Sequence, residues 1–438
     1  MTDYSLSSSC WFCGSQTDVY SPSYSKSFVV SSNDDVLLLS STLSRITITS
    51  ITVEANCGNA ASFTSLDLTP FSLLTQLTVG SNSFVNVREV KLSGLQRLTR
   101  VVVGSNSFRG GSGGGLHLNG CSSLKSVVIG DGSFASFAVF GISGVPLLEE
   151  VRIGNGCLKS VGELRFIGMS GLKRVIVGEN SLSNAEGDFS LKGCASVTEL
   201  VIGSGSMKWF KSVEIVGVPA LETIRNGDDS LKNVNEMRLV GLSKLKRVDV
   251  GEDSFTNKNG SFVLKSCASV SELVVGNRSM SSFSSFEITT MPSLKKITIG
   301  DGCLKKVGAF ALSGLSGLES VVIGSDSFSQ HSGHFALTSP SVKALVVGDG
   351  SFSQYTDCSI HDVTSLETLS IGDNSFVASS LELKSLNGLK SIVIGRRGFE
   401  NCERAVFESL PELTSMYLGW SALSFRDVDN ATLVMKSV

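Results

Sequence analysis

The sequence predicts a repeat solenoid that is rich in β-strands, with little or no helix, and three observations predict it. The phrase L-x-x-V-x-I-G followed by a short turn recurs along most of the 438 residues, at spacings of 23 to 26 residues, mostly 24. Each copy contains two short segments in which apolar and polar residues alternate, as in half-buried strands. No stretch has convincing helical periodicity. Because one such unit cannot bury its apolar face alone, stacked coils are expected to share one core.

The first strand of each copy ends at a glycine, as in "LKSVVIGDGSF" (124–134), where apolar residues stand at offsets 0, 3 and 5. The Gly, Asp and Asn residues after it supply turn chemistry, including left-handed backbone conformations. A degenerate copy, "ITSITVEANCG" (48–58), precedes the regular ones. We expect about 15 coils of 24 residues, which at strand spacing make a rod or arc roughly 70 Å long. The glycine stands at Gly80, Gly104, Gly130, Gly154, Gly178, Gly203, Gly227, Gly251, Gly276, Gly300, Gly324, Gly348, Gly372, Gly395 and Gly419.

The second strand follows the pattern F-x-L-x-G-L, as in "FALSGL" (310–315). A longer period spans three coils, because "LKGCASVTELVIGSGS" (191–206) stands 73 residues from similar segments at 118–133 and 264–279. The first coil of each three-coil superunit has the longest loop. These loops are expected to recur along one edge about every 15 Å, where repeat proteins often place variable contacts. They span residues 108–118, 182–191, 255–264 and 328–337.

Three parts of the chain follow from this periodicity. Residues 41–424 are expected to form the solenoid, residues 1–40 a Ser-rich N-terminal tail or cap, and residues 425–438 the end of the last coil. The first 25 residues contain no apolar segment of the kind that a secretory signal needs, which predicts a cytoplasmic or nuclear protein, with the cell surface as the alternative. Ten Cys without a signal favour reduced thiols.

The phrase L-x-x-L-x-L followed by a turn and a large apolar residue resembles the leucine-rich repeat family. The sub-phrase "IGxxSF", as at 129–134, resembles the "IGxxAF" of the BspA-like leucine-rich repeats, and the resemblance covers about residues 48–424. It implies a leucine-rich-repeat superhelix and a role in recognition of proteins or peptides, without naming a partner.

The composition of the chain limits the classes of partner that we expect. The chain carries 37 basic and 40 acidic residues, a net charge of −3, whereas nucleic-acid binders usually show a basic surplus or stripe. We therefore expect no nucleic-acid partner. No apolar stretch approaches the length of about 18 residues that a membrane span needs, so no span is expected.

Two groups of cysteines could suggest catalysis. Cys121, Cys194 and Cys267 share one repeat position, where other coils have Leu, Val or Met, which is the pattern of a buried small hydrophobe. No His accompanies them periodically, as a nucleophile would require. Cys10 and Cys13 in "CWFC" have the spacing of a redox pair or half a zinc site, but no second pair matches them. We expect no enzyme, metal or cofactor, and an enzyme that uses Cys194 or Cys10 and Cys13 is the least favoured alternative.

The outward residues of the first strand are the candidates for partner binding. They stand two positions before the glycine and are mostly Val or Ile, an apolar stripe that on an open face marks a contact surface. The alternatives are that the stripe reflects β-propensity alone, or that the N-terminal segment covers it. The candidates are Val128, Arg152, Ile176, Val201, Arg225, Asp249, Val274, Val322 and Val346.

The sequence therefore predicts a non-catalytic protein–protein interaction scaffold that binds a protein or peptide partner on its first-strand face and loop edge. This is a prediction from architecture. A cell-surface or adhesive protein of similar fold is the alternative, which glycans at Asn259, Asn277 or Asn430, in Asn-x-Ser/Thr sequences, would favour.

Overall fold

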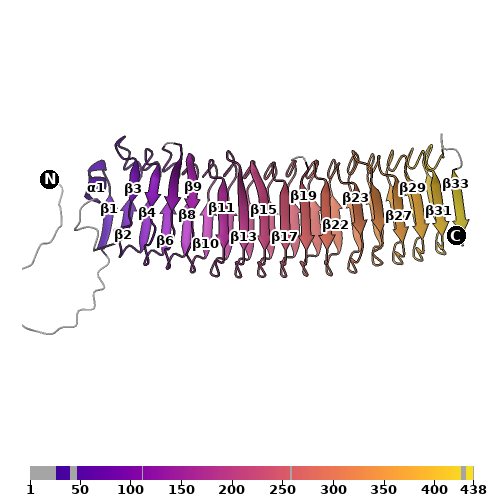
Figure 1. Cartoon of the computed structure of the whole chain (residues 1–438), viewed down its shortest axis with the longest axis horizontal. Coiled ribbons are helices and arrows are strands. Elements are labelled where there is room, and N and C mark those ends of the chain that lie inside the picture. The colour runs from indigo at the N-terminus through magenta and orange to yellow at the C-terminus, as the bar shows by residue number, and fades with distance from the viewer. Residues whose placement is uncertain (1–25, 40–46, 111, 257–258, 426–430, 438) are drawn as a thin grey trace, which may run out of the picture.

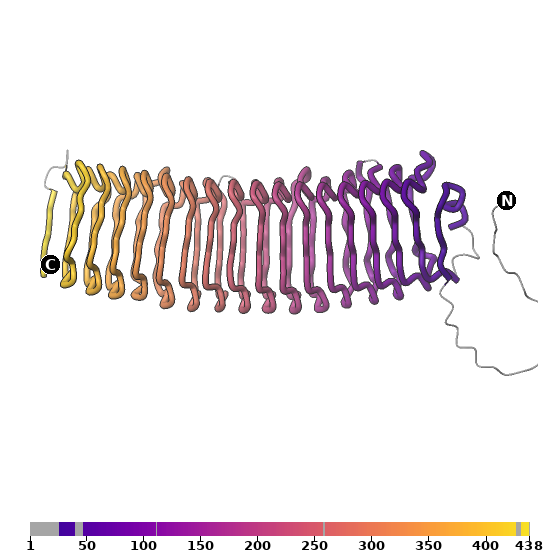
Figure 2. Tube along the Cα trace, turned by 180° about the vertical axis from the view of Figure 1, so that it is seen from behind, coloured from indigo at the N-terminus to yellow at the C-terminus, as the bar shows by residue number. Residues whose placement is uncertain are grey.

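The computed structural model describes residues 26–39, 47–110, 112–256, 259–425 and 431–437, and Cys10 and Cys13 lie outside them. The described chain forms one elongated solenoid, in which successive coils add a strand to each of two opposite faces (Figure 1). The trace advances by one coil at a time from the N-terminal to the C-terminal end (Figure 2). The predicted fold class, a strand-rich repeat solenoid with almost no helix, is confirmed.

In the described residues, a single parallel sheet of 17 strands, here called the first sheet, forms one face. It begins with β1 (Lys26–Val30), within the residues expected to be a tail or cap, and β1 pairs with β2 (Ile48–Val53), the degenerate copy. The sheet then takes the first strand of every coil. These are β4 (Gln76–Val79), β6 (Arg100–Val103), β8 (Ser126–Ile129), β10 (Glu150–Ile153), β12 (Arg174–Val177), β14 (Glu199–Ile202), β16 (Thr223–Asn226), β18 (Arg247–Val250), β20 (Glu272–Val275), β22 (Lys296–Ile299), β24 (Ser320–Ile323), β26 (Ala344–Val347), β28 (Thr368–Ile371), β30 (Ser391–Ile394) and β32 (Ser415–Leu418).

Three shorter parallel sheets form the opposite face of the described solenoid. They run from β3 to β9, from β11 to β21 and from β23 to β33, so this face has two breaks that the first sheet bridges. Their strands are β3 (Ser65–Asp67), β5 (Glu89–Lys91), β7 (Gly114–His117), β9 (Phe137–Gly141), β11 (Glu163–Ile167), β13 (Gly187–Lys192), β15 (Phe210–Val216), β17 (Glu236–Val240), β19 (Ser261–Lys265), β21 (Ser285–Thr289), β23 (Ala309–Leu312), β25 (His334–Leu337), β27 (Asp357–His361), β29 (Ser380–Lys384), β31 (Arg404–Glu408) and β33 (Thr432–Lys436).

One helix, α1 (Asn33–Leu38), covers part of the N-terminal end of the described solenoid. Its N-terminus is fixed by a capping box, in which Ser32 accepts from the Asp35 backbone N–H and the Asp35 carboxylate accepts from the Ser32 backbone N–H. Val36 and Leu39 are almost fully buried and join the core. The helix therefore shields apolar groups at this end.

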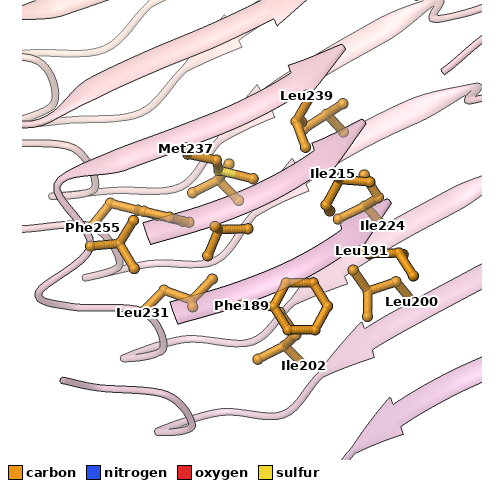
Figure 3. Packing of buried hydrophobic residues seen from close by; sticks show 14 of the residues in the cluster. Phe189, Leu191, Leu200, Ile202, Ile215, Ile224, Leu231, Met237, Leu239 and Phe255 are labelled. Atoms are coloured by element: carbon orange, nitrogen blue, oxygen red, sulfur yellow. The ribbon is translucent and has the colours of Figure 1, made fainter. Parts of the chain in front are cut away.

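The core fills the space between the two faces. In β14, Leu200 and Ile202 point inward, and Phe189 of β13 points toward them from the other face (Figure 3). The large apolar residue after each turn forms an internal column, as the repeat predicts; the ring of Phe352 stacks on those of Phe328 and Phe376, with centroids 4.7 Å apart in both cases. Burial of each large side chain contributes about 1.5–3 kcal/mol.

The turn after the first strand uses left-handed backbone at two positions. The residue two after the glycine, for example Asn374 with φ 55°, is one of them, as its Gly, Asn and Asp residues predict. The second position is the residue whose side chain belongs to the internal apolar column, such as Phe376 with φ 50°. Bulky residues rarely adopt this conformation, so the burial of each ring offsets a local backbone cost.

Two polar ladders join the coils at this turn. Ser351 accepts from the backbone N–H of Ser327 and donates to the backbone carbonyl of Gly324, and serines at the same position of other coils, such as Ser133 and Ser375, repeat both bonds. The residue directly after the glycine forms the second ladder: Oδ1 of Asp349 accepts from the backbone N–H of Asp373 at 2.7 Å. These bonds satisfy backbone groups that the turn leaves without sheet partners.

Candidate interaction surface

The outward side chains of the first sheet form one continuous row. In the first-sheet strands from β4 to β30 the second and fourth residues are buried and the third points away from the core, as in β14, where Leu200 and Ile202 are buried and Val201 between them is not. The strands pair in register, so that Val201 lies between Ile176 and Arg225 on the neighbouring strands. The row, here called the outer row, contains Val128, Arg152, Ile176, Val201, Arg225, Asp249, Val274, Thr298, Val322 and Val346.

The outer row is open to solvent. Arg152, Arg225 and Val346 are exposed, and its other members are half-buried because each lies between two neighbours at strand spacing. The described part of the N-terminal segment, residues 26–39, lies at the end of the solenoid as β1 and α1 and does not cross the row (Figure 1). Within the described residues, the row is therefore an apolar strip with charged interruptions.

Ion pairs between adjacent coils flank the outer row. Arg174 lies 3.3 Å from Glu150, and Glu272 accepts from Arg247 on one side and lies 3.5 Å from Lys296 on the other. A parallel series one residue earlier includes Lys173–Glu149 at 2.7 Å, Lys246–Glu222 at 2.9 Å and Lys343–Glu319 at 3.1 Å.

These flanking pairs are mostly solvent-exposed, so water and salt screen them and each contributes little to stability. The hydrogen bond from Lys173, and then its charge, lower the pKa of the Glu149 carboxyl below its usual value. Lys246 lowers the pKa of Glu222 in the same way. The flank therefore presents charges of alternating sign in a fixed order.

The loop edge carries the long loops that the superunit predicts. Thr256 from the third of these loops and Gln330 from the fourth line a depression of about 400 Å³, together with Lys305. Arg278 and Asp253 also line it, and the Arg278 guanidinium donates to both carboxylate oxygens of Asp253, each at 2.7 Å. The loop edge thus offers a polar, charged surface adjacent to the outer row.

The cysteines of the repeat are internal. Cys194 is fully buried and its thiol donates to the backbone carbonyl of Phe166, and Cys121 and Cys267 are equally buried. Burial raises the pKa of all three thiols, which keeps them protonated at neutral pH. These facts favour the prediction that the cysteines are core residues.

Metal ligands do not gather anywhere in the described residues: among them, no group of three or more His, Cys, Asp and Glu side chains is placed to hold a metal ion. The helix that they contain is six residues long, and none is long and apolar enough to cross a membrane.

One cleft was not predicted from the sequence. It lies at the break between β9 and β11, has a volume of about 380 Å³, and has Val139 and Ile167 exposed on its sides. Gly168 donates its backbone N–H to the carbonyl of Lys192 in the next coil, whereas the described chain contains no equivalent bond from Gly144 to Ile167. The sequence contains one sign of this irregularity: in "FAVFGI" (137–142) the apolar residues 139 and 140 are adjacent and interrupt the alternation of apolar and polar residues.

Among known proteins, the chain is similar to solved structures only. No protein-family model and no curated protein matches the chain. A leucine-rich repeat protein from Bacteroides ovatus is similar at 14% identity and a TM-score of 0.35, over 76% of this chain and 83% of that chain. A leucine-rich cell surface protein from Faecalibacterium prausnitzii is similar at 13% identity and a TM-score of 0.24, over 88% and 87%. TLR13 in its complex with ssRNA13 is similar at 11% identity and a TM-score of 0.23, over 89% and 70%. The fold rests on the strand pairing described above and not on these matches.

Proposed function

We propose that this chain is a non-catalytic scaffold that binds a protein or peptide partner across the outer row and the adjacent loop edge. One observation carries the proposal: the outer row is an in-register row of mainly Val and Ile side chains on an open sheet, interrupted by Arg152, Arg225, Asp249 and Thr298. Desolvation of such a strip supplies affinity. The repeat's resemblance to leucine-rich repeats, which generally act in recognition, agrees with it.

In this proposal the flanking charges determine how the partner is aligned along the outer row. Exposed charges at the rim of an apolar strip steer a partner and disfavour wrong alignments more than they add affinity. Lys173 and Glu149, and then Lys246 and Glu222, repeat the same sign order three coils apart. A partner with apolar side chains along its centre and charges of both signs along one rim fits this surface.

Affinity capture with mass spectrometry tests the proposal. The full chain and the triple variant Val128→Lys, Val201→Lys and Val274→Lys are used as bait. The matched control is Val216→Lys, Val240→Lys and Val263→Lys, three half-buried, outward-facing valines on the opposite face. The proposal requires proteins that the full chain and the control retain and that the triple variant loses. Loss with both variants, or with neither, contradicts it.

The stability of the triple variant is a separate check. Because the three valines point outward, Lys at these positions is expected to leave the melting temperature nearly unchanged. If the triple variant unfolds while the control stays folded, the outer row is part of the core and the proposal fails.

A further inference from the structure

The strands β9 and β11 belong to consecutive coils and lie on the same face, yet they are not paired. β9 carries one extra residue toward β7: Ala138 has no counterpart there, because its neighbours Phe137 and Val139 are in register with two consecutive residues of β7. Such bulges bend a strand and are common where pairing ends. On its other side β9 presents an open strand edge to the cleft described above.

The wall of the cleft that follows β9 carries two backbone donors. In the preceding coil, the backbone N–H groups of Leu118 and Gly120 donate to carbonyls of the next coil, at 2.8 and 2.7 Å. The equivalent N–H groups, those of Ile142 and Gly144, make no such bond within the described residues. Because Ile142 is 7% exposed, an N–H group without a partner there costs free energy.

The facing wall carries the matching acceptors. The carbonyls of Arg165 and Ile167 stand at the acceptor positions of the regular repeat, and in the described chain neither accepts from Ile142 or Gly144. On each wall the two groups are two residues apart, about 6.6 Å along a strand. An extended peptide presents its own carbonyls and N–H groups at this spacing on both edges, which a small rigid molecule does not.

The side chains that line the cleft are mainly apolar. Val139 and Ile167 are 45% and 59% exposed on its sides, and the nearly buried Phe140, Ile142 and Met169 also line it. Its volume of about 380 Å³ is at the lower end of the range of ligand sites, about 300–1,000 Å³. The cleft therefore suits a short segment and not the surface of a folded domain.

The charges in the cleft compensate each other. Glu163 and Arg165 are the two charged residues that line it, and they form an ion pair on β11. The cleft therefore has no excess charge that would favour a charged ligand.

The second break of this face, between β21 and β23, does not have apolar walls. The outward residues of these two strands are small or polar: Ser285, Glu287, Thr289, Ala309 and Ala311. An interrupted sheet is thus not enough to expose large apolar side chains, and their presence beside β9 and β11 is specific to the first break.

We propose that the cleft between β9 and β11 binds a short, uncharged, extended peptide as a strand parallel to both. The carbonyls of the peptide accept from the N–H groups of Ile142 and Gly144. Its own N–H groups donate to the carbonyls of Arg165 and Ile167. Its outward side chains are apolar and contact Val139 and Ile167, whereas its inward side chains are small because they meet the packed core.

The peptide gains room when the break opens. Some Cα atoms of β9 and β11 lie within 8 Å of each other, whereas an inserted strand needs two strand spacings, about 9.6 Å. Because β9 and β11 are not paired, their separation breaks no strand pairing on this face. The first sheet, in which β10 pairs with both β8 and β12, keeps the coils joined.

A phage-displayed library of random linear heptapeptides, panned on the full chain, tests the proposal. We expect enrichment of peptides with apolar residues at alternate positions and small residues between them. The resynthesised peptides should slow hydrogen exchange of the Ile142 and Gly144 amides at least about tenfold. A library without enriched peptides, or enriched peptides that leave both amides unprotected, overturns the proposal.

Variants of the walls locate the site. Val139→Arg with Ile167→Arg places two charges where the apolar side chains of the peptide lie, so the affinity should fall at least about tenfold. Both side chains are exposed, so the melting temperature should stay nearly unchanged. The control, Ala309→Arg with Ala311→Arg, adds the same charge at the second break and should keep the affinity. Equal affinities of the two variants overturn the proposal.

Backbone pairing has a test of its own. Copies of an enriched peptide that are N-methylated at alternate residues lack the donors of one edge and should not bind, and unchanged affinity overturns the proposal. This site is independent of the outer row. If every enriched peptide loses affinity in the triple lysine variant of the outer row and keeps it in the arginine variant of the cleft, the outer-row proposal stands and this one falls.

Discussion

The hydroxyl of Ser351 connects two coils at once, because it accepts from the backbone N–H of Ser327 at 3.1 Å and donates to the carbonyl of Gly324 at 2.7 Å. The first bond is buried, so the Ser327 N–H has no water as a substitute partner, and the second is partly buried. Cys303 fills the same position one coil before Ser327, with its thiol 3.1 Å from the carbonyl of Gly276. The ladder is therefore a repeated device that aligns consecutive turns.

Removal of this hydroxyl should destabilise the solenoid. Ser351→Ala leaves a buried N–H and a partly buried carbonyl without the hydroxyl, which costs about 1–3 kcal/mol of the free energy of unfolding. Urea unfolding measures the loss. Ser351→Cys is the matched control, because cysteine occurs naturally at this position, and we expect a smaller loss. Equal stability of the alanine variant and the wild type would show that the ladder contributes nothing.

The aromatic column allows a second test. Phe352→Ala removes a ring that stacks on Phe328 and Phe376, and the resulting cavity is expected to cost about 3–5 kcal/mol of the free energy of unfolding. Phe352→Leu keeps most of the volume and matches Leu304 and Leu231 in other coils, so its cost should be clearly smaller. Similar costs for the two variants would show that cavity formation is not the cause.

Buried thiols predict a loss of stability at alkaline pH. Burial raises the pKa of Cys157 to about 11 and that of Cys303 to about 12, above the ordinary value of 9.0. Below pH 9 both thiols are protonated in the folded and in the unfolded state, so their contribution to the free energy of unfolding is fully present. As the pH rises from 9 toward 12 the unfolded state loses these protons first, so the free energy of unfolding falls.

Unfolding midpoints measured from pH 7 to pH 11 check this prediction. The double variant Cys157→Ser and Cys303→Ser restores the residue found at this position in neighbouring coils. It should lose less stability above pH 9 than the wild type does. Identical pH profiles for the two proteins would contradict the prediction.

The break between β9 and β11 should be visible in hydrogen exchange. The backbone N–H of Gly168 donates to the carbonyl of Lys192 at 2.9 Å, whereas that of Gly144 has no such bond in the described chain. We expect the Gly144 amide to exchange at least about tenfold faster than the Gly168 amide. Equal protection would show that the two coils are hydrogen-bonded across the break.

Much of this architecture is predictable because a repeat multiplies a weak local signal. The alternation in "ELVI" (199–202) predicts that Leu200 and Ile202 face the core and that Val201 faces outward, and the structure agrees. The serine column is predictable for the same reason, since one position recurs in many coils. The bond from Asp373 N–H to Asp349 Oδ1 was not predicted, because it depends on the distance between two turns and not on residue type alone.

The features that the sequence does not predict depend on which strands, coils or partners lie next to a given coil. The cleft near Val139 lies where β9 and β11 do not pair; the adjacent apolar residues 139 and 140 indicate an irregular strand but do not specify that its pairing is lost. Met416 and Leu418 follow the inward pattern of every earlier coil, so the sequence alone suggests that they are buried. Their exposure depends on whether another layer covers them. The outer row shows the same limit, because its position was predictable and its partner is not.

Site-specific photo-crosslinking tests the proposed outer-row interface most directly. A photoreactive phenylalanine analogue placed at Val201, in the outer row, is compared with the same analogue at Val240, on the opposite face. After irradiation in a lysate of the source cells, we expect covalent adducts with one or a few proteins from position 201 and none of these from position 240. Adducts from position 240 alone, or the same adducts from both positions, would contradict the assignment of the outer row as the partner-binding surface.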